Sequence, residues 1–294
     1  MRQVLVTGAN KGIGYGIAKG ILTDHDDTFV FLGARDPKRG AAAVAELKAL
    51  DDSFAERVRF VQLDVTSDAS VAEAVETVRS ALGEGGRLYG LVNNAGVGLG
   101  GQTLASILDV NVVGMRRVSE AFLPLLDPRR GRIVNITSAA GPSFVARCSE
   151  ARRRFFLDPN TEWADLEALM KECIPLDGDP AAFRERGLGD GDSYGLSKAC
   201  ANTYTLQLAR RHPELKINAV TPGFIETDLT RGYAASQGKK PADLGMKTPD
   251  QGARAPLKLL FGELEGNGRY YGSDGLRSPL DRYRSPGDPE YKGD

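Results

Sequence analysis

The sequence has few residues of the kinds that build disulfide frameworks or histidine metal centres. Its 294 residues include three cysteines, an odd number without paired spacing, so we expect no disulfide framework and a reducing compartment. The two histidines, His25 and His212, are too few for a histidine-based metal centre. The sequence therefore predicts no metal site.

An excess of charge of one sign and long apolar runs are also missing. The 38 basic and 39 acidic side chains almost cancel, and the net charge is −1, so no overall field would draw the protein to nucleic acid or to a membrane surface. The sequence shows no signal peptide and no apolar run as long as a membrane span. We therefore expect a cytoplasmic protein in which any anion site is local.

Short apolar segments alternate with longer segments of helical periodicity along the first two-thirds of the chain. This alternation predicts right-handed βαβ crossovers, and hence a Rossmann-type doubly wound α/β fold with a parallel sheet and helices on both faces. Strands are expected at residues 4–6, 28–32, 58–63, 88–92, 132–137, 216–220 and 268–271, and helices at 13–22, 40–50, 67–82, 104–126, 194–211 and 248–261.

The alternation stops between about residues 141 and 192. This stretch is rich in charge, contains four prolines and predicts one amphipathic helix at 162–173. We interpret it as an insertion within a single domain of residues 1–294, not as a second domain. The tail from about 278 to 294 contains three prolines and is expected to be irregular.

A glycine-punctuated loop, TGANKGIG at residues 7–14, follows the first expected strand and opens the first helix. Glycines let the backbone approach a pyrophosphate, and the helix N-terminus offers unpaired N–H groups. The spacing is GxxxGxG, not the commoner GxGxxG, so the loop alone also fits an ordinary turn. Its context favours a dinucleotide site with candidate contacts at Gly8, Asn10, Gly12, Ile13 and Gly14.

The end of the second strand favours one dinucleotide over another. NAD sites usually place an Asp or Glu there to hold the adenine ribose. Here Ala34 and Arg35 stand at that point, and Lys11 lies in the neighbouring loop. Two cations without a carboxylate favour the 2′-phosphate of NADP(H), because Arg can grip phosphate with two hydrogen bonds. A solvated Arg35 beside Asp36 is the alternative.

Further cofactor contacts are expected after the third and fourth strands. Asp64 and Val65 would lie beside the adenine if the sheet is doubly wound. Asn93, Ala95 and Gly96 end the fourth strand, where small residues would let the chain pass close to the cofactor. The same Asn-rich turn could merely cap the sheet.

Tyr194 and Lys198 stand four residues apart on an expected helix, so both side chains face one side. That spacing is common by chance. Ser138 ends the fifth strand, at the carboxyl edge where open α/β sheets bind ligands. Taken singly, Ser138 also reads as a strand-end cap and Asn111 as a polar residue within a helix.

In combination these residues resemble the short-chain dehydrogenase/reductase family. The glycine loop, the run at 93–96, Asn111, Ser138, the Tyr194–Lys198 pair and Pro222-Gly223 stand in the family's order across nearly the whole chain. The carbonyl reductase branch looks most similar. It shares the NKGIG loop at 10–14, the ARD run at 34–36 and a long interval, here the 56 positions from Ser138 to Tyr194.

The resemblance implies a role for each residue. Tyr194 would give a proton to a substrate carbonyl oxygen as hydride arrives from NADPH, and Ser138 would hydrogen-bond the same oxygen. Lys198 would hold the nicotinamide ribose and lower the pKa of Tyr194, while Asn111 would support a water leading to Lys198. Tyrosine has a pKa of about 10, so work near pH 7 needs a shift of roughly 3 units, or about 4 kcal/mol. The ammonium and a cationic nicotinamide could together supply it.

The resemblance also implies what surrounds the reacting centre. Pro222, Gly223, Ile225 and Thr227 would cover the nicotinamide. The insertion, residues 97–101 and the residues after Pro222 would line the substrate pocket. The insertion would also cover the surface through which family dimers pair, leaving a monomer.

The expected activity is NADPH-dependent reduction of a ketone, aldehyde or quinone carbonyl, with this small molecule as the partner. An NADP-dependent alcohol dehydrogenase acting on a terpenoid, steroid or alkaloid is one alternative, and a non-catalytic NADP(H) sensor is another. Lys11 and Arg35 favour NADP(H), and this cofactor preference favours reduction over alcohol oxidation. The joint presence of Ser138, Tyr194 and Lys198 argues against a sensor.

Overall fold

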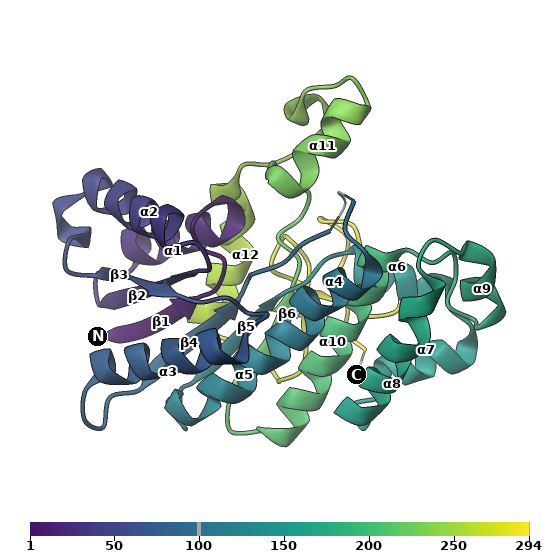
Figure 1. The fold of residues 1–294 in the computed structure, drawn as a ribbon, viewed down its shortest axis with the longest axis horizontal. Coiled ribbons are helices and arrows are strands. Elements are labelled where there is room, and N and C mark those ends of the chain that lie inside the picture. The colour runs from purple at the N-terminus through teal and green to yellow at the C-terminus, as the bar shows by residue number, and fades with distance from the viewer. Residues whose placement is uncertain (99–100, 294) are drawn as a thin grey trace.

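The fold is built on one eight-stranded sheet, seen in a computed structural model that describes residues 1–98 and 101–293. The strand order is β3-β2-β1-β4-β5-β6-β7-β8 (Figure 1). The strands are β1 (Arg2–Val6), β2 (Thr28–Ala34), β3 (Val58–Gln62), β4 (Leu88–Asn93), β5 (Arg132–Ile136), β6 (Lys216–Val220), β7 (Tyr270–Tyr271) and β8 (Arg277–Ser278).

All neighbouring pairs from β3 to β7 are parallel, which confirms the Rossmann-type doubly wound fold. The strand order reverses between β1 and β4, and a sheet of this kind binds ligands beyond the carboxyl ends of those strands. The last strand, β8, was not predicted and runs antiparallel to β7. The expected strand at 268–271 begins only at Tyr270, because Gly268 has a φ of +65°.

Helices cover both faces of the sheet (Figure 1). Side chains alternate along β1, so Val4 and Val6 face one layer while Leu5 faces the other. The first layer holds α1 (Gly12–Asp24), α2 (Pro37–Leu50) and α12 (Pro249–Phe261); the second holds α3 (Asp68–Leu82), α5 (Met115–Phe122) and α10 (Ser193–Arg211). Within the described residues, no helix is long and apolar enough to cross a bilayer.

The helix expected at 104–126 is present as a continuous helical segment, but it is not regular throughout. The segment consists of α4 (Leu104–Leu108), a π-helical turn η2 (Asp109–Gly114), α5 and a 3₁₀ turn η3 (Leu123–Leu125). The π-helical turn places Gly114 against the loop that follows β3, because a Cβ on Gly114 would lie only 2.9 Å from Val65 Cγ2. Turns of this kind occur often at functional sites, and this one carries Asn111.

The insertion contains four helices where one was expected (Figure 1). Phe144, Phe156 and Leu166 pack in one core cluster with Leu196 and Tyr204 of α10. The insertion therefore covers the outer side of α10. Its helices are α6 (Ala140–Arg147), α7 (Glu150–Leu157), the predicted α8 (Trp163–Cys173) and α9 (Pro180–Glu185).

The segment after β6 contains a helix, α11 (Asp228–Ser236), that was not predicted and that projects from the body of the protein (Figure 1). Beyond Ser278 the described tail has no helix or strand, as expected. Short 3₁₀ turns complete the structure: η1 (Asp52–Phe54), η4 (Ile174–Leu176) and η5 (Pro241–Leu244).

Candidate active site

Tyr194, Lys198 and Ser138 meet where the end of β5 faces the start of α10. Asp192 caps α10 by accepting a hydrogen bond from Gly195 N at 2.8 Å, which fixes the turn that carries Tyr194. The buried Lys198 donates from Nζ to Ile136 O at 3.2 Å, and Nζ lies 5.6 Å from the Tyr194 ring centroid. The structure therefore brings together three residues that are far apart in sequence.

Burial moves the pKa values of both α10 residues. The Tyr194 ring is partly exposed, but its enclosed hydroxyl has a pKa raised by burial to about 12, a shift that a hydrogen bond with Ser138 opposes. Burial lowers the pKa of Lys198 to about 8. Desolvation is the largest cause of the Tyr194 shift in the protein without cofactor, and the expectation that Lys198 lowers the pKa of Tyr194 stays a prediction for the protein with its cofactor bound.

Asn111 is held by the chain that leads out of β4. Its side chain accepts from Val97 N at 2.9 Å and donates to Val97 O at 2.9 Å and to Ser197 Oγ at 3.0 Å. A Cβ on Gly96 would lie 3.3 Å from Asn111 Oδ1 and 3.6 Å from Lys198 Nζ. Asn111 therefore fixes residues 96–97 next to Lys198.

Gly98 supports the same centre and was not singled out from the sequence. Its φ is +154°, and a Cβ there would lie only 2.4 Å from Tyr194 Cδ2. No real Cβ makes a contact that short, so glycine lets the chain pass against the tyrosine ring. Within the pocket segment expected at 97–101, Leu99 and Gly100 lie outside the described residues.

The glycine loop forms an open cradle at the N-terminus of α1. Gly8 and Gly12 have φ values of +62° and +58°, which glycine adopts without strain. Among the described residues, no side chain caps the N-terminus of α1, so its N–H groups point outwards with the positive end of the helix dipole. Asn10 and Ile13 are half-buried beside this end, and Gly14 is buried.

Asn94, which the sequence interpretation passed over, joins this cradle to β4. Its Nδ2 donates to Thr7 O at 2.9 Å and to Gly8 O at 3.1 Å. Thr7 Oγ1 in turn accepts from Asn94 N and from Ala95 N, each at 3.0 Å. These bonds hold the two loops side by side and place Ala95 at the cradle. The only sequence signal for Asn94 was its position in the Asn-rich turn.

The structure does not bring the Asn93 side chain to the site. Asn93 is 3% exposed, and its Nδ2 donates to Ser119 Oγ and to Asn135 Oδ1, each at 2.8 Å. It points into the core because side chains alternate along a strand. Val65 is likewise buried, with its side chain against Gly114. Any contact of Asn93 or Val65 with the cofactor would therefore be made by the backbone, and both stay predictions.

The cations expected at the 2′-phosphate are exposed at the far end of this cradle. Arg35 is exposed after β2, while Asp36 is turned away as the cap of α2, accepting from Arg39 N at 3.0 Å. Burial opposes ionisation of Asp64, but hydrogen bonds from Thr66 and the charge of Arg35 hold its pKa below the usual value. Arg35 therefore lies near Asp64, as a site spanning both strands requires.

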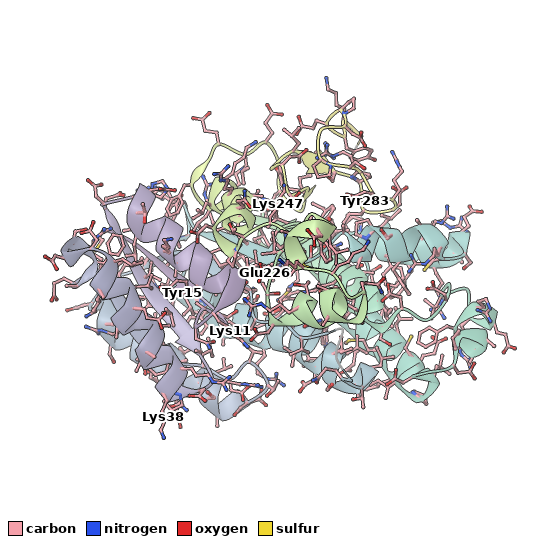
Figure 2. All side chains as sticks on the ribbon, turned by 90° about the horizontal axis from the view of Figure 1, so that it is seen from above. Lys11, Tyr15, Lys38, Glu226, Lys247 and Tyr283 are labelled. Carbon is pink, nitrogen blue, oxygen red and sulfur yellow. The ribbon has the colours of Figure 1, made fainter. Side chains whose placement is uncertain are left out.

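Lys11 forms an ion pair with Asp228 at the start of α11. Each side chain is 56% exposed, so this pair contributes at most about 1 kcal/mol. Seen from above, Lys38 and Lys11 lie towards one end of the upper face and Tyr283 towards the other, with Glu226 between them (Figure 2). Asp228 was not singled out from the sequence.

The loop after β6 returns towards the glycine loop. A Cβ on Gly12 would lie 3.3 Å from Thr227 Cγ2, so these two residues are neighbours. Ile225 is 2% exposed and packs against α12, where a Cβ on Gly252 would lie 2.8 Å from its Cγ1. Pro222 is buried, and Gly223 has a φ of +95°.

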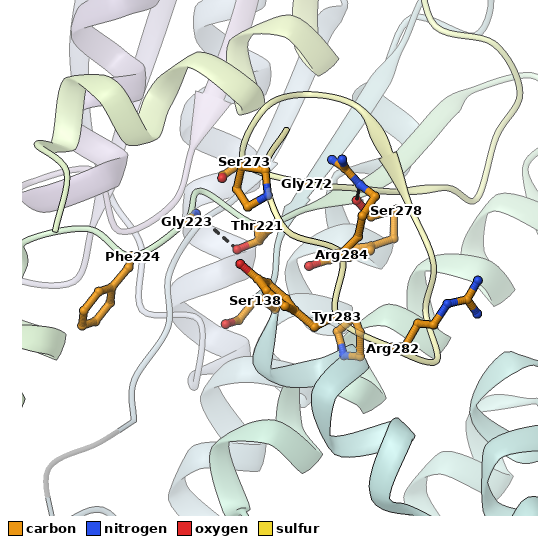
Figure 3. A pocket seen from close by; sticks show the side chains of 14 residues that line it. Ser138, Thr221, Gly223, Phe224, Gly272, Ser273, Ser278, Arg282, Tyr283 and Arg284 are labelled. Carbon is orange, nitrogen blue, oxygen red and sulfur yellow. Dashed lines mark hydrogen bonds between the residues drawn. The ribbon is translucent and has the colours of Figure 1, made fainter. Parts of the chain in front are cut away.

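A cavity of about 210 Å³ opens beside Ser138 (Figure 3). The expected insertion contributes Pro142, and the loop after Pro222 contributes Gly223 and Phe224. The C-terminal tail, which was not expected there, supplies five more lining residues, Ser278, Arg282, Tyr283, Arg284 and Pro286. Tail residues were missed because a proline-rich irregular segment carries no periodicity that would place it over the site.

Known proteins are similar to this one in sequence and in fold. The short chain dehydrogenase family model matches residues 2–149. Carbonyl reductase [NADPH] 3 of Rattus norvegicus is 35% identical over 274 residues, which cover 88% of this chain and 91% of that protein. The (+)-neomenthol dehydrogenase of Arabidopsis thaliana is 31% identical over 300 residues, with coverage of 88% and 91%.

A solved structure has a similar fold. Salutaridine reductase from Papaver somniferum superimposes with a TM-score of 0.74 at 26% identity, covering 92% of this chain and 99% of the other. The protein therefore belongs to the short-chain dehydrogenase/reductase family. The expected resemblance to the carbonyl reductase branch is confirmed by the relatives that bear that name.

Proposed function

We propose that this protein uses NADPH to reduce the carbonyl group of a ketone, aldehyde or quinone to an alcohol. The observation that carries the proposal is the convergence of Ser138, Tyr194 and Lys198 beside an open glycine cradle and a cavity. Relatives named carbonyl reductase [NADPH], with up to 35% identity over most of the chain, support both the reaction and the cofactor.

The residues present fit NADP(H). The uncapped N-terminus of α1 and the positive-φ glycines suit a pyrophosphate. The exposed Arg35 and Lys11 would hold the 2′-phosphate, and Lys198 would hold the nicotinamide ribose. Asn10, Ile13, Asp64, Ala95, Gly96 and the loop at 222–227 complete the proposed contacts.

NADPH, when bound, supplies the hydride. Tyr194 is protonated at neutral pH because its pKa is near 12, so its phenol can donate a proton to the substrate carbonyl oxygen. Ser138, which hydrogen-bonds the phenol in the free protein, would donate to the same oxygen. The ammonium of Lys198 would then stabilise the Tyr194 phenolate, because it lies next to the ring.

The two directions of the reaction use Tyr194 in different protonation states. Reduction needs the phenol as proton donor, and alcohol oxidation needs the phenolate as base. Dehydrogenation of a terpenoid alcohol remains the second candidate, supported by the neomenthol dehydrogenase relative. Comparing initial rates in both directions at pH 7 tests this point, and faster oxidation would favour the second candidate.

The proposed activity is tested with purified protein, NADPH and a panel of quinones, aldehydes and ketones, following NADPH absorbance. We expect turnover of some members, and no turnover of any would contradict the proposal. Tyr194→Phe should lose nearly all turnover yet still bind NADPH, as measured by fluorescence titration. Retained turnover would remove Tyr194 from the proton transfer, whereas NADPH binding without wild-type turnover would support a sensor.

We further propose that the chain forms one domain and is a monomeric cytoplasmic protein. The packing of Phe144, Phe156 and Leu166 against α10 supports the monomer, because the insertion covers the helix through which family dimers pair. Light scattering at low micromolar concentration should give the mass of one chain. A stable dimer or tetramer would contradict the proposal.

A further inference from the structure

The C-terminal tail is fastened over the cavity beside Ser138. Arg284, whose side chain is 6% exposed, pairs with Asp274 and donates to Ser278 Oγ at 2.9 Å and to Asp288 O at 2.7 Å. Burial opposes ionisation of Asp274, but hydrogen bonds from Arg284 and nearby backbone N–H groups hold its pKa below the usual value. The tail is therefore irregular in conformation yet anchored by a largely buried ion pair.

A second set of contacts closes the tail into a loop. Tyr291 N donates to Arg277 O at 3.0 Å, and Arg277 N donates to Glu290 Oε1 at 2.9 Å. The Tyr291 ring lies between the guanidinium groups of Arg277 and Arg282, each 5.4 Å from its centroid. Residues 277–291 are thus tied down at both ends and in the middle.

Tyr283 directly precedes the anchor Arg284 and lines the cavity. Figure 3 shows its side chain extending across the cavity towards Ser138, Thr221 and Gly223. Tyr270 connects it to the reacting centre: burial raises the pKa of Tyr270, and Tyr283 and Tyr194 both add to that shift. Tyr283 and Tyr194 therefore both lie near Tyr270, which lines the same cavity as Tyr283.

The ring is also available to a ligand. Tyr283 is 55% exposed and Phe224 is 41% exposed, and both line this cavity. An aromatic ring whose face is open can stack on a flat ring system of a ligand. The two arginines that line the cavity are both paired with carboxylates, Arg284 with Asp274 and Arg282 with Asp281.

We propose that Tyr283 is a specificity-determining residue: its ring forms the tail-side wall of the substrate pocket and favours flat carbonyl compounds, such as aromatic ketones and quinones, over small aliphatic ones. The inference rests on the proposed reductase function. A flat ring system would stack on the Tyr283 face while its carbonyl oxygen reaches Ser138. A small aliphatic aldehyde would reach Ser138 without touching the tail.

The test compares kcat/KM for an aromatic ketone and for a small aliphatic aldehyde in three variants. Tyr283→Ala should lose about three- to tenfold on the aromatic ketone, as expected for one aromatic contact, and little on the aldehyde. Tyr283→Phe keeps the ring and should match the wild type. Lys292→Ala is the control, because it changes an exposed tail residue that does not line the cavity.

The outcomes separate this inference from the proposed function. Aldehyde turnover by the wild type establishes the reductase, whatever the variants do. Equal losses on both substrates in Tyr283→Ala, or an equal loss on the aromatic ketone in Lys292→Ala, would overturn the role of the Tyr283 ring.

Discussion

Lys198 carries a charge that the folded protein buries at a cost in stability, and removing that charge should stabilise the protein while abolishing its activity. Burial lowers the pKa of Lys198 from 10.5 to about 8. A difference of about 2.5 units corresponds to about 3 kcal/mol by which the protonated side chain disfavours folding. Lys198→Met removes this cost but leaves Ile136 O without its donor, at about 1 kcal/mol.

The net gain for Lys198→Met is then about 2 kcal/mol at pH 7, which raises Tm by roughly 3 °C for a chain of this size. The gain should depend on pH. A lowered pKa disfavours the folded state fully below pH 8, and the penalty disappears as pH rises from about 8 to 10.5, because only the unfolded wild type still holds the proton. The variant's advantage should therefore be largest below pH 8.

Thermal melts of the cofactor-free wild type and variant between pH 6 and 10, followed by circular dichroism, measure this difference. Lys171→Met, at a lysine whose side chain is 71% exposed in α8, is the control and should give a small difference that does not vary with pH. A variant less stable than the wild type at pH 7, or an advantage independent of pH, would refute the reasoning. If Lys198→Met is more stable than the wild type and has lost its turnover, the protein keeps Lys198 for its function at a cost in stability.

Three further predictions concern the cofactor, the catalytic centre and the tail. Arg35→Ala should weaken NADPH binding about tenfold and leave NADH binding nearly unchanged, since only NADPH has the 2′-phosphate; calorimetry with both cofactors measures this, and equal losses would contradict it. Gly98→Ala should sharply lower turnover while NADPH still binds, because its Cβ would displace Tyr194 from the position seen here; wild-type turnover would show that the chain can move aside. Arg284→Ala should leave Asp274 unpaired and release the tail, so limited proteolysis should cut near residues 283–290 faster than in the wild type, and unchanged cleavage would show that the other contacts suffice.

The alternating sheet and helices could be read from the sequence because their signals are local and periodic. Val4 to Val6 is apolar and β-branched at both ends, and the glycine loop after it marks the turn into α1. The helices of the insertion were missed apart from α8, because α6, α7 and α9 have six to eight residues and show too little periodicity. The turn at Asp109–Gly114 was missed because its distortion comes from contacts with residues outside it.

Some residues of the candidate site could likewise be predicted from the sequence, and others could not. Tyr194 and Lys198 were found from a spacing of four, and Ser138 from its place after a strand. The direction of the Asn93 side chain could not be predicted, because it depends on register, and here it points into the core. Asp228 and Tyr283 lay outside any motif.

The sequence by itself determined the order of strands and helices, the phosphate-binding loop and the spacing of the Tyr194–Lys198 pair, since each follows from short-range geometry. Only the tertiary structure decided that Ser138 lies beside Tyr194 and that the tail brings Tyr283 to the same cavity. It also decided the protonation of the pair, because desolvation depends on everything packed around a group. Long-range packing therefore sets the chemistry of residues that local pattern had already identified.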